Sequence, residues 1–267
     1  MKGRGSRGDR RRPRLSGRAK SGNSNTLPNG FGLRGKVALV TGASQGIGLA
    51  IADALASEGC HLVICSRNQS ALNRAAKKLA KHKVDVLPVA CDVRGSDAVQ
   101  ALLAEAERRF RRLDILINNA GVSHANLNIG ELPVASWREV IDTNLTGMFY
   151  VTRAALLLMK RGGVIVNNLS IAAKKLFAGS AGYAASKHGA LALTVALREE
   201  LRPRGIRVIA LLPGATDTAI WEQFWPDAPR KKMMRPATVA LAVVKALSLP
   251  QQATIEELTM LPSAGVL

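Results

Sequence analysis

The sequence predicts a single α/β domain over residues 31–267, built on a doubly wound parallel sheet. From residue 36, short β-branched or aliphatic runs alternate with longer segments of helical period. The runs are apolar on both faces, as strands covered by helices on both sides require. A glycine-rich turn follows the first run, at the sheet edge where such folds bind ligands. The 267 residues, 47% of them hydrophobic, suffice for one large core, and no internal repeat is evident.

The expected elements alternate regularly along the chain. Seven strands are expected, at residues 36–41, 61–66, 84–90, 113–118, 163–170, 206–212 and 255–260. Helices are expected between them, at residues 46–58, 69–81, 96–110, 136–160, 182–202 and 236–247. Right-handed crossovers would give a doubly wound sheet, in which a ligand is expected at the carboxyl ends of the strands.

Residues 1–30 form a basic segment that is expected to be a disordered tail. They hold nine Lys/Arg and one acid, a net charge of +8 out of +19 for the whole chain. Their composition leaves little to bury. Without interleaved aromatics or a groove-fitting helix, specific nucleic-acid binding is disfavoured. The preferred interpretation of the tail is an inert extension that aids solubility, or a start codon assigned too far upstream. Two alternatives remain: the tail could contact an anionic membrane, or it could be an Arg-rich transit peptide. The glycines of the tail disfavour the amphipathic helix that a transit peptide forms.

The three cysteines, Cys60, Cys65 and Cys91, are odd in number and lack the spacing of metal ligands, so no metal site is expected. Cys65 and Cys91 lie in apolar runs and are interpreted as small buried hydrophobes in a reducing compartment. No run approaches eighteen uncharged apolar residues, and the first residues lack the apolar stretch of a secretory signal. A cytoplasmic location without a membrane span is therefore expected.

The turn after the first strand carries the sequence TGASQGIG, residues 41–48. Three features of a phosphate-binding turn each need a glycine: the tight turn itself, the close approach of the phosphate, and the close contact of helix and strand. The glycines of this turn have the spacing that these features require. The helix that follows offers free N–H groups and its positive dipole end to a pyrophosphate. Glycine turns are common, but this one lies between a strand and a helix and so predicts a dinucleotide site of the Rossmann type. The residues expected to form it are Gly42, Ser44, Gln45, Gly46, Ile47 and Gly48.

The expected helix at 182–202 carries Tyr183 and Lys187 four residues apart on one face. Coincidence is one explanation. The other is chemistry, because a phenol with its ordinary pKa of about 10 is a poor proton donor, and bringing that pKa to about 7 takes roughly 4 kcal/mol. A cation about 4 Å away, at an effective dielectric of about 20, supplies roughly that amount. Lys187 is therefore expected to lower the pKa of Tyr183.

Together these motifs resemble the short-chain dehydrogenase/reductase family over about residues 34–260. Residues 41–48 match the family's TGxxxGIG, and Tyr183 with Lys187 match its YxxxK. The other matching segments follow in the family's order: CDV at 91–93, NNAG at 118–121, DTNLTG around Asn144, NNLS ending at Ser170, and PGATDT at 213–218. The joint occurrence of these motifs in order is very specific, and only the tail lies wholly outside it.

The resemblance implies a role for each matched residue. Tyr183 would be the general acid/base, aided by Lys187 and by the charge of the oxidised nicotinamide. Ser170 would hydrogen-bond the substrate oxygen, and Asn144 would hold a water that links Lys187 to solvent. The implied cofactor contacts beyond the glycine turn are Ser66, Arg67, Asp92, Val93, Asn119, Ala120, Gly121, Tyr183, Lys187, Pro213, Gly214, Thr216 and Thr218.

Simpler structural roles stand beside these. Ser170 could cap the end of a strand, and Asn144 could satisfy a helix backbone. Asn118 and Asn119 are interpreted as structural, tying the sheet to the cofactor loop by hydrogen bonds.

Cofactor choice depends on the end of the second strand, VICSRN at 63–68. The resemblance implies that users of NAD carry an acidic residue there. This chain has Ser66 and Arg67, and a guanidinium suits the 2′-phosphate of NADP. One departure is that many users of NADP also carry a base in the glycine loop, where this chain has Gln45. NADP (NADPH) is predicted over NAD; the alternative is that Arg67 is only a solvated charge.

The substrate is expected to be a hydrophobic or 3-oxoacyl-type carbonyl, or the matching alcohol. The segment 218–236 lies where the family keeps a mobile lid. Its apolar residues would either face the substrate or pack the lid on its own domain: Trp221, Phe224, Trp225, Met233 and Met234. His124 could edge the pocket, although a surface position is preferred for it.

There is also some likeness to the 3-oxoacyl carrier-protein reductases, because Arg161 and Arg204 fall where those enzymes dock an acidic carrier. The net charge of +11 on residues 31–267 would help to steer such a partner. The chain lacks the glycine-rich finish that is typical of the carrier-protein enzymes.

An NADP-dependent oxidoreductase is therefore predicted, with a homodimer or homotetramer that pairs through the helices near 136–160 and 182–202. The alternative functions are a dinucleotide-binding regulator or scaffold without turnover, and a redox sensor that contacts nucleic acid through its basic tail.

Overall fold

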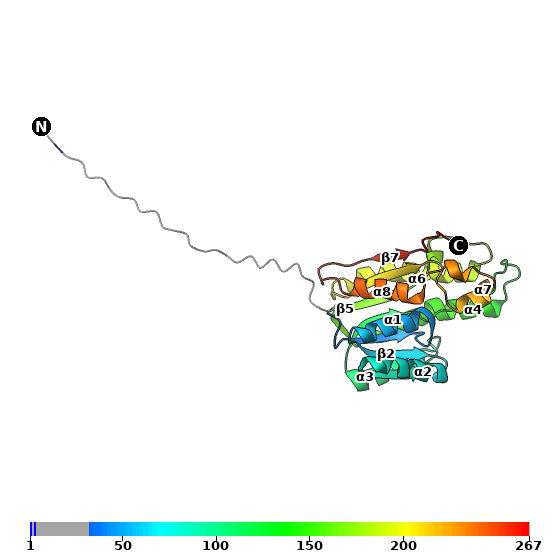
Figure 1. Ribbon diagram of the computed structural model, residues 1–267, viewed down its shortest axis with the longest axis horizontal. Coiled ribbons are helices and arrows are strands. Elements are labelled where there is room, and N and C mark those ends of the chain that lie inside the picture. The colour runs from blue at the N-terminus through cyan, green and yellow to red at the C-terminus, as the bar shows by residue number, and fades with distance from the viewer. Residues whose placement is uncertain (2, 4–31, 267) are drawn as a thin grey trace.

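The computed structural model describes residues 1, 3 and 32–266, and nearly all of the predicted tail at 1–30 lies outside the described residues. It contains a parallel sheet of seven strands covered by helices, which confirms the predicted fold class (Figure 1). The strands are β1 (Val37–Thr41), β2 (His61–Ser66), β3 (Val86–Ala90), β4 (Leu113–Asn118), β5 (Met159–Asn168), β6 (Arg207–Pro213) and β7 (Glu257–Met260). Their order across the sheet is β3-β2-β1-β4-β5-β6-β7.

The order of the strands places the binding crevice. From β1 the chain runs outward to β2 and β3, then returns to the other side of β1 and continues from β4 to β7. All six neighbouring pairs are parallel. The reversal between β1 and β4 opens a crevice at the carboxyl ends of these strands, which is where doubly wound sheets bind ligands.

Helices cover both faces of the sheet. On one face lie α1 (Gly46–Ser57), α2 (Gln69–Leu79) and α8 (Pro236–Leu247), packed on a core of fully buried aliphatic residues such as Ile51 and Leu72. On the other face lie α3 (Ser96–Phe110), α5 (Gly147–Ala155) and α6 (Ala181–Leu201). Strands that are buried on both faces explain why their sequences are apolar throughout rather than alternating.

One predicted helix is wrong in its extent. In place of a helix over 136–160, the chain forms α4 (Val134–Ile141), a π-helical turn η2 (Asp142–Thr146) and α5. The helix ends at Ala155 because the chain then joins the sheet: Leu113 N donates to Leu158 O at 3.2 Å, and β5 begins at Met159. The apolar run before Met159 fits a helix and a buried strand equally well, so its periodicity did not reveal the boundary.

The helix expected at 69–81 ends in a short turn, η1 (Ala80–His82), that follows α2 directly. Three short helices were not expected from the sequence: η3 (Ile171–Ala173), α7 (Ile220–Phe224) and η4 (Arg230–Lys232). No helix among the described residues has both the length and the apolar character needed to cross a bilayer.

The cysteines Cys60, Cys65 and Cys91 are free and buried, which confirms the predicted burial of Cys65 and Cys91 and adds that of Cys60. Burial raises the pKa of the Cys60 thiol to about 12. That thiol is therefore protonated at neutral pH and packs as a small hydrophobe.

Candidate active site

A cavity of about 900 Å³ opens at the carboxyl ends of the strands. It brings together residues from segments far apart in the sequence, including the glycine turn, the end of β2, the NNAG segment and α6. The predicted site residues that line it are Gly42, Ser44, Gln45, Gly46, Ile47, Gly48, Ser66, Arg67, Asp92, Val93, Asn119, Ala120, Gly121, Ser170, Tyr183, Lys187, Pro213, Gly214, Thr216 and Thr218. Asn144 does not line this cavity; it borders a much smaller one beside it.

The glycine turn is held too tightly for larger residues. Gly42 has a φ of +64°, and a Cβ there would lie 2.9 Å from the Cα of Ala120. A Cβ on Gly48 would lie 2.4 Å from the carbonyl O of Gly42. The turn leads directly into α1, whose N-cap residue Gln45 makes no side-chain capping bond. The first N–H groups of α1 are thus free to meet an anion, which fits the pyrophosphate of a dinucleotide.

Asn119 ties the glycine turn to the sheet. Its Nδ2 donates to the carbonyl O of Thr41 at 2.9 Å, and its Oδ1 accepts from Asn168 Nδ2 at 2.8 Å. Thr41 Oγ1 accepts from the main-chain N of both Asn119 and Ala120 at 2.9 Å. The ends of β1, β4 and β5 are therefore joined under the cleft, in agreement with the structural interpretation of Asn119.

Tyr183 and Lys187 lie together on the wall of the cleft. Lys187 Nζ is 5.5 Å from the centre of the Tyr183 ring and donates to the main-chain O of Asn168 at 3.2 Å. Lys187 is 5% exposed, and Tyr183 is partly buried. A buried ammonium faces an aromatic ring and a carbonyl, both of which favour its charge.

The pKa of Tyr183 shifts in the direction opposite to the one expected from the sequence. Burial raises the pKa of the Tyr183 phenol, and a hydrogen bond with Ser170 opposes this. Burial also lowers the pKa of Lys187 to about 8. The described residues therefore do not show the expected lowering of the Tyr183 pKa by Lys187. Desolvation by burial is the main cause of the shift, and the hydrogen bond with Ser170 is what acts in the lowering direction.

Ser170 and Asn144 both make structural contacts, although not the ones named as simpler roles: Ser170 caps a short helix rather than a strand, and Asn144 bonds the backbone of a loop rather than of a helix. Ser170 Oγ accepts from Ala172 N at 3.1 Å at the start of η3. Asn144 lies in the π turn η2, a rare conformation that is frequent at functional sites. Its Oδ1 accepts from Val122 N at 2.8 Å, and its Nδ2 donates to Val122 O at 2.9 Å. Ser170 makes its bond to Ala172 and still lines the main cavity.

Charged residues surround the end of the cleft next to β2. Arg67 Nη1 lies 3.3 Å from Glu139 Oε1, which links the end of β2 to α4. Arg94 Nη2 lies 2.6 Å from Asp92 Oδ2, and the hydrogen bond from Arg94 is the main cause that lowers the pKa of Asp92. Arg67 is 53% exposed at the side chain, so its guanidinium can reach a ligand at the mouth of the cleft.

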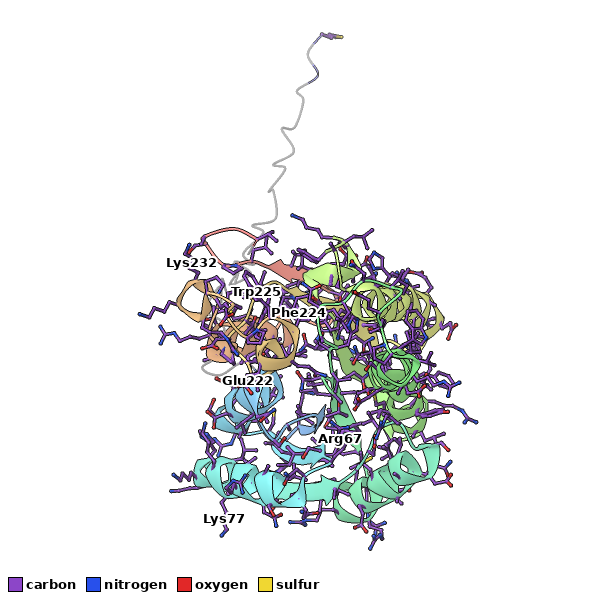
Figure 2. All side chains as sticks on the ribbon, turned by 90° about the vertical axis from the view of Figure 1, so that its right-hand side faces the viewer. Arg67, Lys77, Glu222, Phe224, Trp225 and Lys232 are labelled. Atoms are coloured by element: carbon purple, nitrogen blue, oxygen red, sulfur yellow. The ribbon has the colours of Figure 1, made fainter. Side chains whose placement is uncertain are left out.

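The other end of the cleft is apolar. Trp221, Phe224 and Trp225 line it, whereas Met233 is buried in the domain and Met234 packs on the core around α1 and α8. In the segment 218–236, the three aromatic residues therefore face the cleft, whereas the two methionines pack on the domain. Figure 2 shows Phe224 and Trp225 well apart from Arg67, which marks the opposite end of the cleft.

The same cavity is also lined by apolar residues that were not expected from the sequence, among them Leu176, Phe177, Leu261 and Val266. These four come from the loop before α6 and from the chain beyond β7. No motif identifies a residue that reaches a cleft only through the fold.

One expectation about a single residue is wrong: His124 is 1% exposed, so it does not lie at the surface.

Arg204 is exposed, and its Nη2 donates to the main-chain O of Leu156 at 2.9 Å and of Met159 at 3.0 Å. These two bonds tie the guanidinium of Arg204 to the turn between α5 and β5.

Comparison with known proteins gives consistent matches along the chain. A family model described as short chain dehydrogenase matches residues 36–229. An uncharacterized oxidoreductase of Staphylococcus aureus is 37% identical over 232 residues, which cover 86% of this chain and 98% of that protein. An alcohol dehydrogenase from the archaeon Thermococcus sibiricus, complexed with 5-hydroxy-NADP, is 33% identical with a TM-score of 0.79, covering 84% of this chain and 95% of the other.

A 3-ketoacyl-(acyl-carrier-protein) reductase from Brucella melitensis, complexed with NADH, is 30% identical with a TM-score of 0.78. That match covers 86% of this chain and 98% of the other. The similarity therefore includes both the glycine turn and the helix that carries Tyr183 and Lys187.

Proposed function

The chain belongs to the short-chain dehydrogenase family of oxidoreductases, and we propose that it interconverts a carbonyl and an alcohol with NADP(H). One observation carries the proposal: Ser170, Tyr183 and Lys187 converge on one cleft that also contains the glycine turn. A proton donor and a phosphate-binding turn within one cavity are what reduction of a carbonyl by a dinucleotide requires.

The residues of the cleft fit a nicotinamide dinucleotide. The turn from Gly42 to Gly48 and the free end of α1 would hold its pyrophosphate. Asp92 and Val93 would hold the adenine, and the segment from Pro213 to Thr218 would border the nicotinamide. When bound, the cofactor supplies the hydride. The protein supplies position, exclusion of water and the proton.

In this proposal Tyr183 donates the proton to the carbonyl oxygen, and Ser170 hydrogen-bonds the same oxygen. Lys187, with a pKa of about 8, is mostly protonated at pH 7 and keeps a positive charge beside the phenol ring. Because the protein alone raises the pKa of Tyr183, the phenol keeps its proton until the substrate arrives. At neutral pH the protonated phenol can therefore act as the acid in reduction of a carbonyl.

The preference for NADP rests on the end of β2. Ser66 and Arg67 offer a hydroxyl and a guanidinium where a carboxylate would repel the 2′-phosphate. Similar structures contain either 5-hydroxy-NADP or NADH, so the family does not decide the cofactor and the proposal depends on this chain's own residues.

The substrate class follows from the apolar end of the cleft. Trp221, Phe224 and Trp225 offer aromatic surface and few polar groups, which suits a hydrophobic ketone or a 3-oxoacyl chain. Docking of an acyl carrier protein through Arg161 remains part of the proposal, but Arg204 contributes less to it because its guanidinium bonds two carbonyls of its own chain. A cytoplasmic homodimer or homotetramer completes the proposed description.

The test is to mix the protein with NADPH and each of a panel of hydrophobic ketones. Consumption of NADPH is measured as the loss of nicotinamide absorbance. Tyr183→Phe is expected to lower kcat by roughly 10²- to 10⁴-fold, the range for removal of a general acid. The affinity for NADPH, measured by fluorescence, should stay within about threefold of the wild type, because the glycine turn and Arg67, which would hold the phosphates of the cofactor, are unchanged in this variant. Turnover by the Phe variant at the wild-type rate would contradict the mechanism.

A further inference from the structure

Helix α6 needs a cap that its own sequence does not provide. Its first N–H groups lack a carbonyl one turn earlier, and Ser180 occupies the N-cap position where a serine ordinarily accepts from one of them. Here Ser180 makes no capping bond, and its Oγ donates instead to the carbonyl O of Phe177 at 2.6 Å. The N–H of Tyr183, the third residue of the helix, must find a partner from elsewhere.

His124 is that partner. Its Nε2 lies 3.2 Å from Tyr183 N across 59 residues of sequence. Its Nδ1 lies 2.6 Å from the carbonyl O of Ala125, and a carbonyl can only accept, so the ring proton is assigned to Nδ1. Nε2 then accepts the N–H of Tyr183. The residue is 1% exposed, so water does not compete for either nitrogen.

The space for the imidazole depends on a glycine. A Cβ on Gly182 would lie 3.1 Å from Nε2 of His124, closer than most side-chain contacts in proteins. The residue directly before Tyr183 therefore has to be small for the ring to reach the helix end.

The loop that carries His124 is joined to the entry of α6 at a second point. Leu127 N donates to Gly179 O at 3.1 Å. Ser123 and Asn126, on either side of His124, line the same cleft as Tyr183. The loop and the first turn of the helix thus form one wall of the cleft, with His124 behind it.

We propose that His124 is a positioning residue for the reaction. By accepting the N–H of Tyr183, it holds the first turn of α6 and so sets where the phenol hydroxyl stands relative to Ser170 and the substrate. His124 does not touch the reacting atoms in this scheme. The inference rests on the proposed function, in which Tyr183 is the acid/base. A displacement of about 1 Å in such a group can lower a rate by about a hundredfold.

Two variants separate the hydrogen bond from the bulk of the ring. His124→Gln places an amide oxygen as many bonds from Cα as Nε2, so it retains the acceptor. His124→Leu keeps a similar volume without any acceptor. The Leu variant is expected to lower kcat by roughly 10- to 100-fold with the KM for NADPH unchanged, and the Gln variant to stay within about threefold of the wild type.

A second measurement does not depend on turnover. The Tyr183 amide should exchange its hydrogen with solvent about tenfold faster or more in His124→Leu than in the wild type, and at the wild-type rate in His124→Gln. Amide exchange followed by nuclear magnetic resonance resolves this single site. Gly182→Ala, which crowds the ring from the helix side, should reproduce part of the loss in kcat.

Opposite results would overturn the inference. If His124→Leu matches the wild type in kcat and in Tyr183 amide exchange, or if His124→Gln is no better than His124→Leu, His124 does not position Tyr183. Tyr183→Phe is measured in parallel to keep the two proposals distinguishable. An active Tyr183→Phe defeats the proposed function, whereas an inactive Tyr183→Phe beside a fully active His124→Leu defeats only the role of His124.

Discussion

Lys187 is a buried cation whose position serves the site more than the stability of the fold. It is 5% exposed, and burial lowers its pKa to about 8 from an ordinary value of 10.5. The folded state therefore binds this proton less tightly than the unfolded chain. The resulting loss of stability is fully present below about pH 8 and fades as the pH rises toward 10.5.

Lys187→Met is expected to stabilise the protein while abolishing turnover. At pH 7 the free energy of unfolding should rise by up to about 3 kcal/mol, because a difference of one pKa unit corresponds to about 1.4 kcal/mol. Loss of the bond from Lys187 to Asn168 offsets part of this gain. Urea unfolding at pH 7 and pH 10 measures it, and the gain should shrink at pH 10. Lys77→Met on α2, at an exposed position, is the matched control (Figure 2). A Lys187→Met protein less stable than the wild type at both pH values would contradict this account.

Arg67 is the residue on which the proposed preference for NADP depends. Arg67→Gln is expected to weaken the binding of NADPH by roughly 10- to 100-fold, the usual worth of a charge-assisted hydrogen bond, and to leave NADH almost unchanged. Fluorescence titration with both cofactors measures the difference. Arg74→Gln, an exposed change on α2, is the control. Equal weakening of the two cofactors would mean that Arg67 does not contact the 2′-phosphate.

At the scale of elements, the unit β1–turn–α1 decides whether a dinucleotide can bind. The turn brings the end of β1, the NNAG segment and the start of α1 so close together that two of its glycines leave no room for a Cβ. Close packing of this kind is intolerant of even one added methyl group.

Gly48→Ala is expected to destabilise this unit by roughly 1–3 kcal/mol and to weaken NADPH binding. The added Cβ would lie 2.3 Å from Asn119 Nδ2 and 2.4 Å from Gly42 O, so α1 must move away from the strand. Gly130→Ala, where no atom lies within 4 Å of the added Cβ, is the matched control and should change stability by less than about 0.5 kcal/mol. Thermal unfolding with and without NADPH measures both effects. Identical behaviour of the two variants would show that the turn is looser than its geometry implies.

At the scale of the whole molecule, the surface of α5 and α6 carries exposed apolar side chains. Phe149 on α5 is 44% exposed, and Val195 on α6 is 43% exposed. These two helices fall within the segments through which the sequence predicts pairing of subunits. Large apolar residues on a helix surface are typical of protein–protein contacts.

Phe149→Glu is therefore expected to convert the proposed dimer or tetramer into smaller species, because a buried carboxylate without a partner is strongly unfavourable at an interface. Light scattering coupled to size-exclusion chromatography measures the mass. Lys77→Glu on α2 is the control for a change in charge. If the wild type is already monomeric, or if Phe149→Glu keeps the wild-type mass, pairing through α5 is wrong.

The sequence by itself determined the presence of seven strands, most helices, the glycine turn and the pair of Tyr183 and Lys187, and its resemblance to a known family supplied many of the other residues around the cleft. These depend on local patterns: a strand buried on both faces must be apolar throughout, and a turn that meets phosphate must carry glycine at set positions. Tyr183 and Lys187 could be paired from their spacing alone because one helical turn separates them.

Only the tertiary structure decided which residues surround the reacting groups and how they alter them. His124 reaches Tyr183 across 59 residues, the apolar residues of segment 218–236 divide between cleft and core, and Met159 leaves a helix to join a strand. Whether the pKa of Tyr183 is raised or lowered likewise depends on how much water the folded walls of the cleft exclude. Burial and contacts between distant segments are properties of the folded chain, so no local pattern of residues contains them.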